Sequence, residues 1–484
     1  MGVTTVNWQG RFAILGWGVS GKASAHALVK RGAQLCAFDG RAREDDQSGN
    51  DANVEFVSEA DSDALAQEVI DWKPDCIVVS PGIPAHHPIF SAAKNADIEL
   101  IGEVELAWRL QEDSEHAGRP WLCVTGTNGK TTTVGMLGAM LRAAGENAVE
   151  VGNIGLPICE AIDTDATVFA VELSSFQLHT VSTVSPLASV CLNVDADHLD
   201  WHGSAQAYAA DKAKVYHLTQ KACFYPASDI TVENMVAEAD VVEGARAIGL
   251  TLGIPSISQV GWVEDALVER AFVEKRHMQA QFLAEVDDLR VAYHDGVTDA
   301  ARMDATAAAG LARAFGVPPE AVAQGLRSFT PALHRRAVIS HAADVTWIDD
   351  SKATNAHAAV ASLSGITPGT AVWIAGGDTK GQEFGNLVAR VAPLLRGVVV
   401  IGKDRSAIVN ALRQRAPQIP FVEVDGHEDW MFSVVNEAVA LSRPGDTVVL
   451  APACASWDQF RSYAQRGDVF RDAVKRLEAN WAAQ

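Results

Sequence analysis

The sequence lacks any hydrophobic run long enough to cross a bilayer, which takes about 20 apolar residues. Short apolar stretches such as residues 397–402 fall well below that length. The N-terminus also lacks the basic segment and apolar stretch of a signal peptide. We therefore expect a soluble, cytoplasmic protein without membrane insertion.

Basic residues are comparatively few, since 39 Lys and Arg stand against 61 Asp and Glu and give a formal net charge of −22. Nucleic acids and anionic membrane surfaces repel such an acidic chain, so neither is an expected partner. An anionic small-molecule substrate is compatible with this charge, because the local field inside a cleft decides its binding. We expect a monomer that acts on small molecules.

Cysteine is also scarce. The seven cysteines are an odd number without metal-ligand spacing, and four lie in apolar, strand-like segments: Cys36, Cys76, Cys123 and Cys191. This placement indicates buried thiols in a reducing compartment.

Short strands alternate with helices along the chain, a pattern typical of α/β folds with parallel sheets. The 484 residues predict about three domains. Strands are predicted at 11–15, 34–38, 76–80, 122–125, 167–172, 188–193, 345–349, 371–375, 397–401 and 447–450. Helices are predicted at 22–31, 304–315 and from 318, with a linker at 112–120. Residues 227–296 show no clear pattern beyond irregular strands.

Residues 121–133 form the clearest motif, an apolar strand followed by a tight turn and a Lys-Thr pair that opens a helix. Backbone N–H groups of such a turn cradle nucleoside triphosphate phosphates, Lys130 adds a point charge, and the Thr131 hydroxyl can reach Mg²⁺. An ordinary phosphate loop has the pattern G-x-x-x-x-G-K-[ST], whose first Gly would fall at position 124 of this chain. That position is Val and the first Gly is Gly126, so this loop is shorter. The alternative to a phosphate-binding loop is a Gly-Lys-Thr sequence that stands between a strand and a helix by chance. The predicted ATP contacts are Gly126, Thr127, Asn128, Gly129, Lys130, Thr131 and Thr132.

A second glycine-rich turn, residues 16–21, follows the first predicted strand, and Asp39 ends the next. Glycines let backbone approach a diphosphate, and the acid can bind a ribose hydroxyl. NAD binding, UDP binding and a plain glycine-rich turn all fit this pattern. Ser80 and Gly82 follow another strand of the same sheet, where ligands of open α/β sheets bind.

Glu172 and His198 both follow predicted strands and therefore lie at the same sheet edge as Thr131. A hydroxyl, a carboxylate and an imidazole can complete a Mg²⁺ shell that includes phosphate oxygens. Singly, Glu172 can also be a surface carboxylate and His198 a hydrogen-bonding residue. Lys212 lies in a helical segment with a second lysine, and its spacing favours a solvated helix face.

The last third carries polar residues on several strand-end loops. Arg335 can bind phosphate through its planar guanidinium. Two lysines and nearby hydroxyl residues on these loops suit a small dicarboxylate, although each loop alone can be an ordinary one. The residues concerned are Arg335, Asp350, Lys352, Thr354, Lys380, Ser456 and Tyr463.

Together these motifs resemble the Mur ligase family over nearly the whole chain. The loop at 125–131 is shared by that family and by folylpolyglutamate synthases, whereas the segments at 172–177, 350–355 and 452–460 resemble the D-glutamate-adding member. The resemblance implies an α/β fold of three domains: a Rossmann-like UDP-substrate-binding domain (1–114), a P-loop-type ATP-binding domain with a mostly parallel sheet (115–332), and a Rossmann-like amino-acid- and nucleotide-binding domain (333–484).

The resemblance also assigns roles to residues. It implies a carbamylated Lys212, whose anion can hold Mg²⁺, and it implies two Mg²⁺ ions near Thr131, Glu172, His198 and Lys212. Catalytic roles are implied for Lys130, Glu172, His198 and Lys212. Further nucleotide contacts are implied for Asp304, Arg335 and Asp350. UDP-substrate contacts are implied for Gly18, Ser20, Asp39, Ser80, Gly82, Asn153, Gln177 and His198. The D-glutamate pocket is implied for Lys352, Thr354, Lys380, Ser456 and Tyr463.

The sequence departs from the family pattern at two of these positions. Asp304 stands where the family usually has an adenine-contacting Asn, and Ala300 and Ala301 replace the preceding His-Asn. Tyr463 replaces a more usual Phe. The departure at Asp304 puts adenine selectivity and ATP affinity in question, whereas Tyr in place of Phe is a tolerable change.

The implied reaction is ATP-dependent ligation of D-glutamate to UDP-N-acetylmuramoyl-L-alanine through an acyl phosphate, a step of peptidoglycan precursor synthesis, completed by domain closure. The alternatives are a nicotinamide-dependent oxidoreductase built on the 16–21 turn and a non-enzymatic nucleotide switch built on the Lys130 loop. Folylpolyglutamate synthase activity would leave the N-terminal UDP-type domain unexplained.

Overall fold

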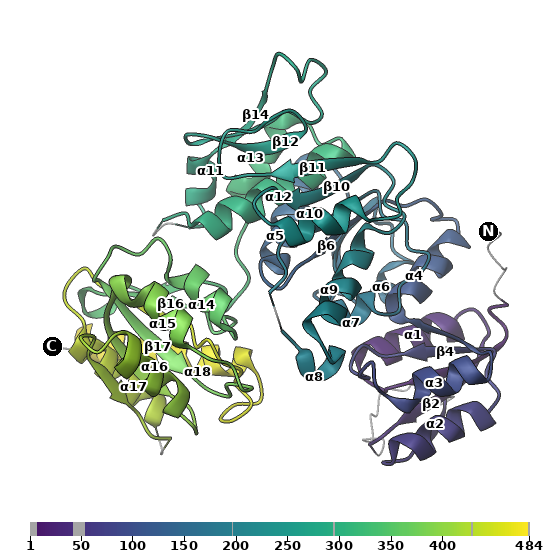
Figure 1. Cartoon of the computed structure of the whole chain (residues 1–484), viewed down its shortest axis with the longest axis horizontal. Helices are drawn as coiled ribbons and strands as arrows, with labels where there is room; N and C mark the ends of the chain where they lie inside the picture. Colours follow the sequence, from purple (N-terminus) through teal and green to yellow (C-terminus); the bar gives the residue numbers. More distant parts are fainter. Residues whose placement is uncertain (1–6, 42–53, 196, 294–295, 427–428, 483–484) are drawn as a thin grey trace. The chain divides into compact units, whose positions relative to one another are not determined.

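The computed structural model describes residues 7–41, 54–195, 197–293, 296–426 and 429–482. Within these residues the strands form three sheets of five, nine and six strands. The chain divides into two compact units, one comprising residues 1–285 and 304–328 and the other residues 286–303 and 329–484. Figure 1 labels the elements of both units. The mostly parallel α/β architecture confirms the predicted fold class.

The first sheet has the order β3-β2-β1-β4-β5, and all its pairings are parallel. Its strands are β1 (Arg11–Leu15), β2 (Gln34–Asp39), β3 (Glu55–Ser58), β4 (Cys76–Val79) and β5 (Glu99–Gly102). The helices are α1 (Val19–Val29), α2 (Ser62–Asp71), α3 (Pro88–Asn95) and α4 (Glu103–Glu112). Because β2 and β4 lie on opposite sides of β1, the loop after β1 sits at the topological switch point, where such sheets bind ligands.

The second sheet has the order β14-β13-β12-β11-β10-β9-β6-β8-β7 and is parallel from β12 to β7. Its strands are β6 (Trp121–Thr125), β7 (Ala148–Gly152), β8 (Val168–Glu172), β9 (Ala188–Cys191), β10 (Ala222–Pro226), β11 (Arg246–Leu250), β12 (Gln259–Val263), β13 (Ala266–Glu269) and β14 (Gln281–Glu285). The principal helices are α5 (Lys130–Ala143), α6 (Ile158–Ala161), α7 (Ser175–Leu178), α8 (Leu199–His202), α9 (Ala205–Ala213), α10 (Ile230–Ala237) and α13 (Pro319–Ser328).

The stretch that showed no clear pattern in the sequence, residues 227–296, holds α10, strands β11 to β14 and the short helix α11 (Val286–Arg290). Three of these strands, β12 to β14, form an antiparallel edge of the second sheet. The following helix, α12 (Asp299–Phe315), begins five residues before the predicted start at 304. The expectation of strands in this stretch is therefore confirmed.

The third sheet has the order β15-β16-β20-β17-β18-β19, with only the edge strand β15 antiparallel among the pairs described. Its strands are β15 (Ala337–Ser340), β16 (Thr346–Asp349), β17 (Ala371–Gly376), β18 (Leu395–Ile401), β19 (Phe421–Glu423) and β20 (Thr447–Leu450). The helices are α14 (Ala356–Leu363), α15 (Gly385–Val391), α16 (Ser406–Arg415), α17 (Trp430–Leu441) and α18 (Tyr463–Ala482).

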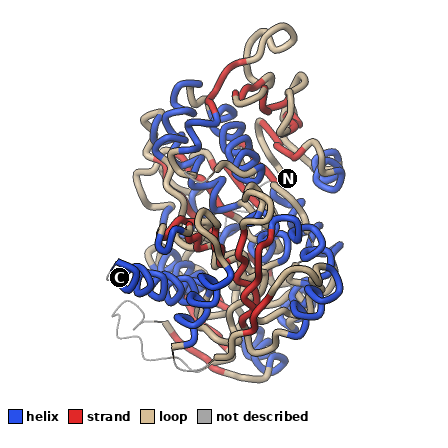
Figure 2. The backbone as a smooth tube through the Cα atoms, turned by 90° about the vertical axis from the view of Figure 1, so that its left-hand side faces the viewer, coloured by secondary structure: helices blue, strands red, loops and turns tan. Residues whose placement is uncertain are grey.

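Buried side chains alternate between the two faces of this third sheet, as the period of two along a strand requires. In β17, Trp373 and Ala375 face a core with α14, α15 and α16, while Val372 and Ile374 face α17 and α18. Figure 2 shows α18 as the long helix that leads to the C-terminus. Helices therefore cover both faces, and ligand access is left to the strand ends.

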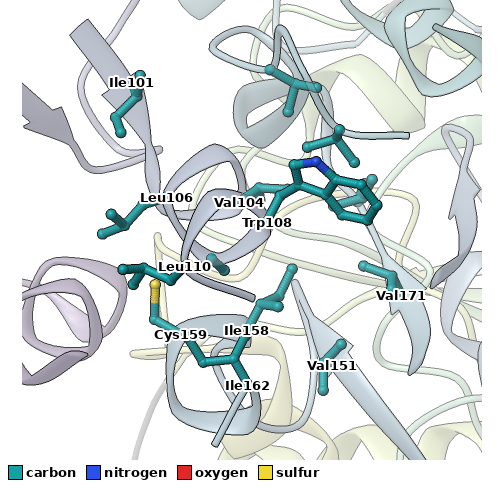
Figure 3. Packing of buried hydrophobic residues seen from close by; sticks show 14 of the residues in the cluster. Ile101, Val104, Leu106, Trp108, Leu110, Val151, Ile158, Cys159, Ile162 and Val171 are labelled. Atoms are coloured by element: carbon teal, nitrogen blue, oxygen red, sulfur yellow. The ribbon is translucent and has the colours of Figure 1, made fainter. Parts of the chain in front are cut away.

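One hydrophobic core continues from the first sheet into the second. It contains side chains of α1, of α4, of α6 and of strands in both sheets. Figure 3 shows α4 residues such as Leu106 and Leu110 in this core together with Ile158 and Cys159 of α6. This shared core explains why both sheets fall within one compact unit, and the predicted boundary at 114/115 stays a prediction.

Two acids of α4, Glu103 and Glu105, are buried beside this core and differ in their partners. Burial raises the pKa of Glu103 to about 7, although its side chain accepts the backbone N–H of Cys159 at 2.9 Å. Burial also acts to raise the pKa of Glu105, but hydrogen bonds from Thr183 and Ser182 and the charge of Arg109 outweigh it and lower this pKa below its ordinary value. Glu105 is thus the ionised anchor between α4 and the second sheet.

All seven cysteines are buried free thiols, in agreement with the sequence. Burial raises the pKa of the thiols, for example to about 11 for Cys191. Within the ranges described, no helix combines the length and the apolar character needed to cross a membrane.

Candidate active site

The turn between β6 and α5 has the form expected of a phosphate-binding loop. Gly129 caps α5 with a φ of 85°, a left-handed conformation that favours glycine. Lys130 Nζ folds back on the loop and donates to the carbonyl oxygens of Gly126 at 2.8 Å and Thr127 at 3.0 Å. The α5 N-terminus and the Lys130 ammonium therefore lie together, and both attract phosphate.

The loop is held by a residue that sequence reasoning did not single out. Asn193 follows β9, and its side chain accepts the N–H of Asn128 at 2.9 Å and donates to the Asn128 carbonyl at 3.2 Å. Tyr208 adds a hydroxyl contact to Thr127 Oγ1 at 2.9 Å. The only available signal was an Asn at the last position of the strand predicted at 188–193.

Glu172 lies where the sequence placed it, at the carboxyl end of β8 and beside the loop. Its Oε2 accepts the Thr131 hydroxyl at 2.7 Å, and its Oε1 accepts Asn153 Nδ2 at 2.8 Å. One carboxylate thus joins the predicted metal-binding hydroxyl to a predicted substrate residue. The chain brings these three candidates together.

Lys212 is buried, with 2% of its surface exposed, so the solvated helix face that its spacing favours is wrong. Burial, reinforced by the charge of Lys130, lowers the pKa of Lys212 to about 7. Its Nζ donates to the Gly126 carbonyl at 2.8 Å and lies 4.7 Å from the centroid of the Tyr208 ring. The tertiary fold therefore places this amine directly behind the phosphate loop.

His198 occupies a strained position next to this cluster. It precedes α8 with a φ of 52°, and its ring packs edge-on against Phe176 with centroids 4.8 Å apart. Asp197 is 3.7 Å from its Nε2. Uncommon left-handed backbone in a residue with a side chain is typical of functional sites.

Below His198, Asp211 ties together the short helices α7, α8 and α9. It accepts His179 Nδ1 at 2.8 Å and His202 Nδ1 at 3.0 Å, and it pairs with Lys214. Gln177 caps α7 through a reciprocal pair of hydrogen bonds with Ser174. This network positions the elements that carry Gln177, His198 and Lys212.

Asp304 of α12 lies against the phosphate loop. Thr133 Oγ1 donates to its Oδ1 at 3.3 Å, and a Cβ on Gly129 would lie 2.3 Å from that same oxygen. The Asp304 carboxyl group therefore lies beside the helix N-terminus that the sequence predicts to contact phosphate.

The glycine-rich turn after β1 is fixed by two of the predicted residues. Ser80 Oγ donates to the Gly16 carbonyl at 2.7 Å, and Asp39 Oδ2 accepts the Trp17 N–H at 2.7 Å. Ser20 lies in the first turn of α1, and Gly18 precedes that helix. Gly82 follows Ser80 in the adjoining loop. Asp39 and Ser80 thus shape the turn at the switch point of the first sheet.

In the second compact unit, three strand-end loops converge. The Ala453 N–H donates to the Ala353 carbonyl at 2.9 Å, and residues 378 and 455 form an antiparallel bridge. Lys352 Nζ lies 4.3 Å from the centroid of the Tyr463 ring. Because β16, β20 and β17 are neighbours, their loops carry Lys352, Thr354, Lys380, Ser456 and Tyr463 to one edge.

Arg466 is the residue that holds these loops, and no motif in the sequence pointed to it. It is 1% exposed. Its guanidinium donates to the Ser351 carbonyl at 2.7 Å, to Ser351 Oγ at 3.0 Å, and to the carbonyls of Cys454 and Ala455. Burial lowers its pKa to about 10, which still leaves it charged near neutral pH.

Asp350 and Arg335 are also close together in this unit. Burial raises the pKa of Asp350 to about 6, while the Ser362 hydroxyl and the charges of Arg335 and Arg336 act in the opposite direction. Next to them, His334 Nδ1 lies 2.6 Å from Asp349 Oδ2. The charge of Arg335 therefore acts on the carboxyl group of Asp350, the other predicted nucleotide residue.

Three family models match this chain: Mur ligase MurD-like N-terminal domain over residues 10–102, Mur ligase middle domain over residues 124–249, and Mur ligase glutamate ligase domain over residues 334–454. The chain belongs to the Mur ligase family. Members of this family are ATP-dependent, ADP-forming peptide ligases. The N-terminal match also favours a Mur ligase over the nicotinamide-dependent alternative.

Several Mur ligases are similar to the chain over nearly their full length. The UDP-N-acetylmuramoylalanine–D-glutamate ligase of Streptomyces coelicolor is 47% identical, covering 96% of this chain and 98% of the relative. The ligase of the same name from Thermobifida fusca is 44% identical with the same coverages of 96% and 98%. These matches confirm the family resemblance found in the sequence.

Solved Mur ligase structures share the fold. The MurF ligase of Thermotoga maritima in complex with ADP is 15% identical, with a TM-score of 0.56 over 98% of this chain and 100% of that chain. The UDP-N-acetylmuramate–alanine ligase MurC of the same organism is 16% identical, with a TM-score of 0.54 and the same coverages.

Mg²⁺ fits the residues beside the Mur ligase phosphate loop. Oxygen atoms of Thr131 and Glu172 lie 2.7 Å apart there, and Mg²⁺ prefers oxygen ligands from one or two carboxylates together with phosphates and water. Within the described ranges, no group of three or more His, Cys, Asp or Glu side chains is arranged to hold a metal ion. The bound nucleotide would therefore supply part of any Mg²⁺ shell.

We predict that Asp304→Asn lowers the KM for ATP by about fivefold. Two like unit charges about 4 Å apart repel each other by about 1 kcal/mol even at the dielectric constant of water, which corresponds to about fivefold in binding. Asp299→Asn, an exposed acid of the same helix, should leave this KM unchanged. Steady-state kinetics with varied ATP measures both, and an unchanged or higher KM in Asp304→Asn would contradict the repulsion.

Proposed function

We propose that this chain ligates D-glutamate to UDP-N-acetylmuramoyl-L-alanine with conversion of ATP to ADP and phosphate. The observation that carries the proposal is the 47% identity, over 96% of the chain, to a Streptomyces ligase named for that reaction. The phosphate loop with its buried Lys212, and the convergent loops of the second unit, support it.

In the first step, an oxygen of the alanine carboxylate attacks the γ-phosphorus of ATP, the bond to the β–γ bridging oxygen breaks, and ADP leaves. Carboxylate and triphosphate repel each other, so this step depends on positioning and on neutralised charge. Lys130 and the N–H groups at the start of α5 supply positive potential at the phosphates. Mg²⁺, held beside Thr131 and Glu172, would neutralise further phosphate charge.

In the second step, the amine of D-glutamate attacks the carbonyl carbon of the acyl phosphate. A tetrahedral intermediate forms, the amine loses a proton, and inorganic phosphate leaves as the peptide bond is completed. We assign the pocket for D-glutamate to Lys352, Thr354, Lys380, Ser456 and Tyr463. The cation of Lys352 over the Tyr463 ring supports this assignment, since ammonium groups bind carboxylates.

We further propose that Lys212 is carbamylated and joins His198 near the metal-binding oxygens. Carbamylation joins a neutral amine to CO₂ and releases a proton, and burial behind the loop favours the neutral amine. The product is an anion, which could hold Mg²⁺ where an ammonium would repel it. UDP-substrate contacts are assigned to Gly18, Ser20, Asp39, Ser80, Gly82, Asn153 and Gln177.

The test of the function is phosphate release with ATP, Mg²⁺ and UDP-N-acetylmuramoyl-L-alanine, comparing four amino acids. D-Glutamate should support turnover at least about a hundredfold above L-glutamate, meso-diaminopimelate or L-lysine, since a pocket built around one stereoisomer leaves buried polar groups unpaired with the others. Equal rates with L-glutamate, or release without any amino acid, would contradict the proposal and favour the nucleotide switch.

A further inference from the structure

Basic side chains make up half of the residues that line a hollow of about 660 Å³ in the first compact unit. Its wall contains Lys221, Arg246, Arg276, His277 and Arg313, together with the ring of Phe272. Glu274 is the acid in this lining. Such a concentration of positive charge stands out in a chain whose net charge is −22.

This hollow lies at the amino ends of the parallel strands, whereas the phosphate loop lies at their carboxyl ends. Lys221 immediately precedes β10 and Arg246 begins β11, so both mark the amino ends of their strands. The phosphate loop follows the carboxyl end of β6, and β6, β9, β10 and β11 are all parallel. The basic hollow is therefore separate from the ATP site described above.

The charges of the hollow are largely uncompensated. Glu269, fully buried behind it, lies 3.4 Å from Arg313 Nη2, but its other oxygen accepts the N–H groups of Ala271 and Phe272. In the part of the chain that the structure describes, no carboxylate lies within 4.0 Å of the cationic nitrogens of Lys221, Arg246 or Arg276. These neighbouring cations repel one another, and a bound anion would offset that repulsion.

Protein contacts fix the positions of two arginine side chains in the wall. Arg246 Nη1 donates to the Ala271 carbonyl at 2.8 Å, and its guanidinium carbon lies 5.0 Å from the centroid of the Phe272 ring. Arg313 Nη1 donates to the Val317 carbonyl at 2.6 Å, while its Nε is buried without a hydrogen-bond partner. Both guanidinium groups are thus held in place by protein contacts.

The ionisation of the wall agrees with this geometry. Burial, followed by the charges of Arg246 and Arg313, lowers the pKa of Lys221. Burial and the charge of Arg276 likewise lower the pKa of Arg246, although Glu269 acts against them. Like charges therefore crowd each other in the hollow.

We propose that this hollow is a binding site for a small anion bearing two or more phosphate groups. Arg276 and the remaining donors of Arg246 match phosphate oxygens, while Lys221 and Arg313 add positive charge. The volume falls within the range of small-molecule sites, about 300–1,000 Å³. A multivalent phosphate balances several of these cations at once, which a single carboxylate cannot.

The test uses inorganic tripolyphosphate as the probe and calorimetric titration of the full chain carrying Lys130→Ala, which weakens the phosphate loop as a competing site. We expect one tripolyphosphate to bind per chain. Adding Arg246→Gln and Arg276→Gln should weaken this binding by about tenfold or more, because two direct charges are removed. Lys275→Gln, in the same loop but outside the lining, is the matched control and should change it less than twofold.

Because Arg246 also holds the loop at Ala271, Lys221→Gln serves as a second, exposed variant and should weaken binding by about threefold. Thermal denaturation shows whether each variant is folded. The proposal is overturned if tripolyphosphate does not bind, if Lys275→Gln weakens it as much as the lining variants, or if Lys221→Gln leaves it unchanged. If citrate bound as tightly as tripolyphosphate, the proposal that the site prefers phosphate groups would be overturned.

Discussion

Replacing Lys130 with alanine is expected to lower the kcat of D-glutamate ligation by about a thousandfold or more. The ammonium is held at the phosphate loop by the Gly126 and Thr127 carbonyls, where charge develops as the γ-phosphoryl group transfers. Removing one preorganised group that stabilises such charge costs about 10²- to 10³-fold, and a cation on a transferring phosphoryl group can be worth more. ADP release in the complete assay measures the effect.

The control is Lys94→Ala, which removes the same charge from an exposed position on α3 and should leave kcat within twofold. The free energy of unfolding of Lys130→Ala should be close to that of the parent protein, because the two hydrogen bonds that it loses belong to a partly exposed loop. A Lys130→Ala protein that ligates D-glutamate at a near-normal rate would refute the assignment of this loop to ATP.

The second large effect concerns stability. We expect Glu105→Gln to lower the free energy of unfolding by about 3–5 kcal/mol, as breaking a buried ion pair does. The buried carboxylate accepts the N–H groups of Ser182 and Thr183 and the Thr183 hydroxyl, and it pairs with Arg109 at 2.8 Å. Without the Glu105 carboxylate, Arg109 would keep only Glu99 as an ionic partner, and α4 would be held less tightly to the second sheet. Urea denaturation followed by tryptophan fluorescence measures the change.

Glu99→Gln is the matched control, because Glu99 pairs with the same Arg109 at 2.8 Å from a side chain that is 52% exposed. Exposed pairs contribute about 0.2–1 kcal/mol, so this variant should be only slightly destabilised. Equal effects of the two substitutions would show that Glu105 is not the anchor.

The Glu105 contribution also has a defined pH dependence. Its pKa is lowered in the folded state, so its contribution is fully present above the unfolded pKa of about 4.5 and is lost as pH falls through the folded value. The difference between wild type and Glu105→Gln should therefore shrink in acid. Glu103 differs in sign, because its folded pKa of about 7 makes its ionisation destabilising as pH rises from about 4.5 to 7.

Much of the fold was predictable because parallel strands buried on both faces read as continuous apolar runs. The strands at 11–15 and 447–450 were predicted with the bounds that the structure has. Strands β3, β5, β7, β10, β15 and β19 were missed, and none of them is buried along its whole length. The helix predicted at 22–31 begins three residues earlier, at Val19, inside the glycine-rich turn.

The candidate site was predictable where residue type and local motif coincide, as at Lys130, Thr131 and Glu172. Local spacing was misleading at Lys212, since a helix face that looks solvated in sequence is covered by the phosphate loop and Tyr208. Arg466 and Asn193 could not be found locally. Their partners are more than 60 residues away or in other loops, and no periodic pattern encodes such contacts.

By itself, the sequence determined the α/β class, the phosphate loop, the family and the residues that follow each strand, because these depend on hydrophobic period, turn chemistry and short motifs. Only the tertiary structure decided which side chains are buried together: the amine of Lys212 behind the loop, the charge of Asp304 beside it, and the basic hollow at the far sheet edge. Burial and electrostatic environment depend on segments distant in the chain, and they are fixed only when those segments pack.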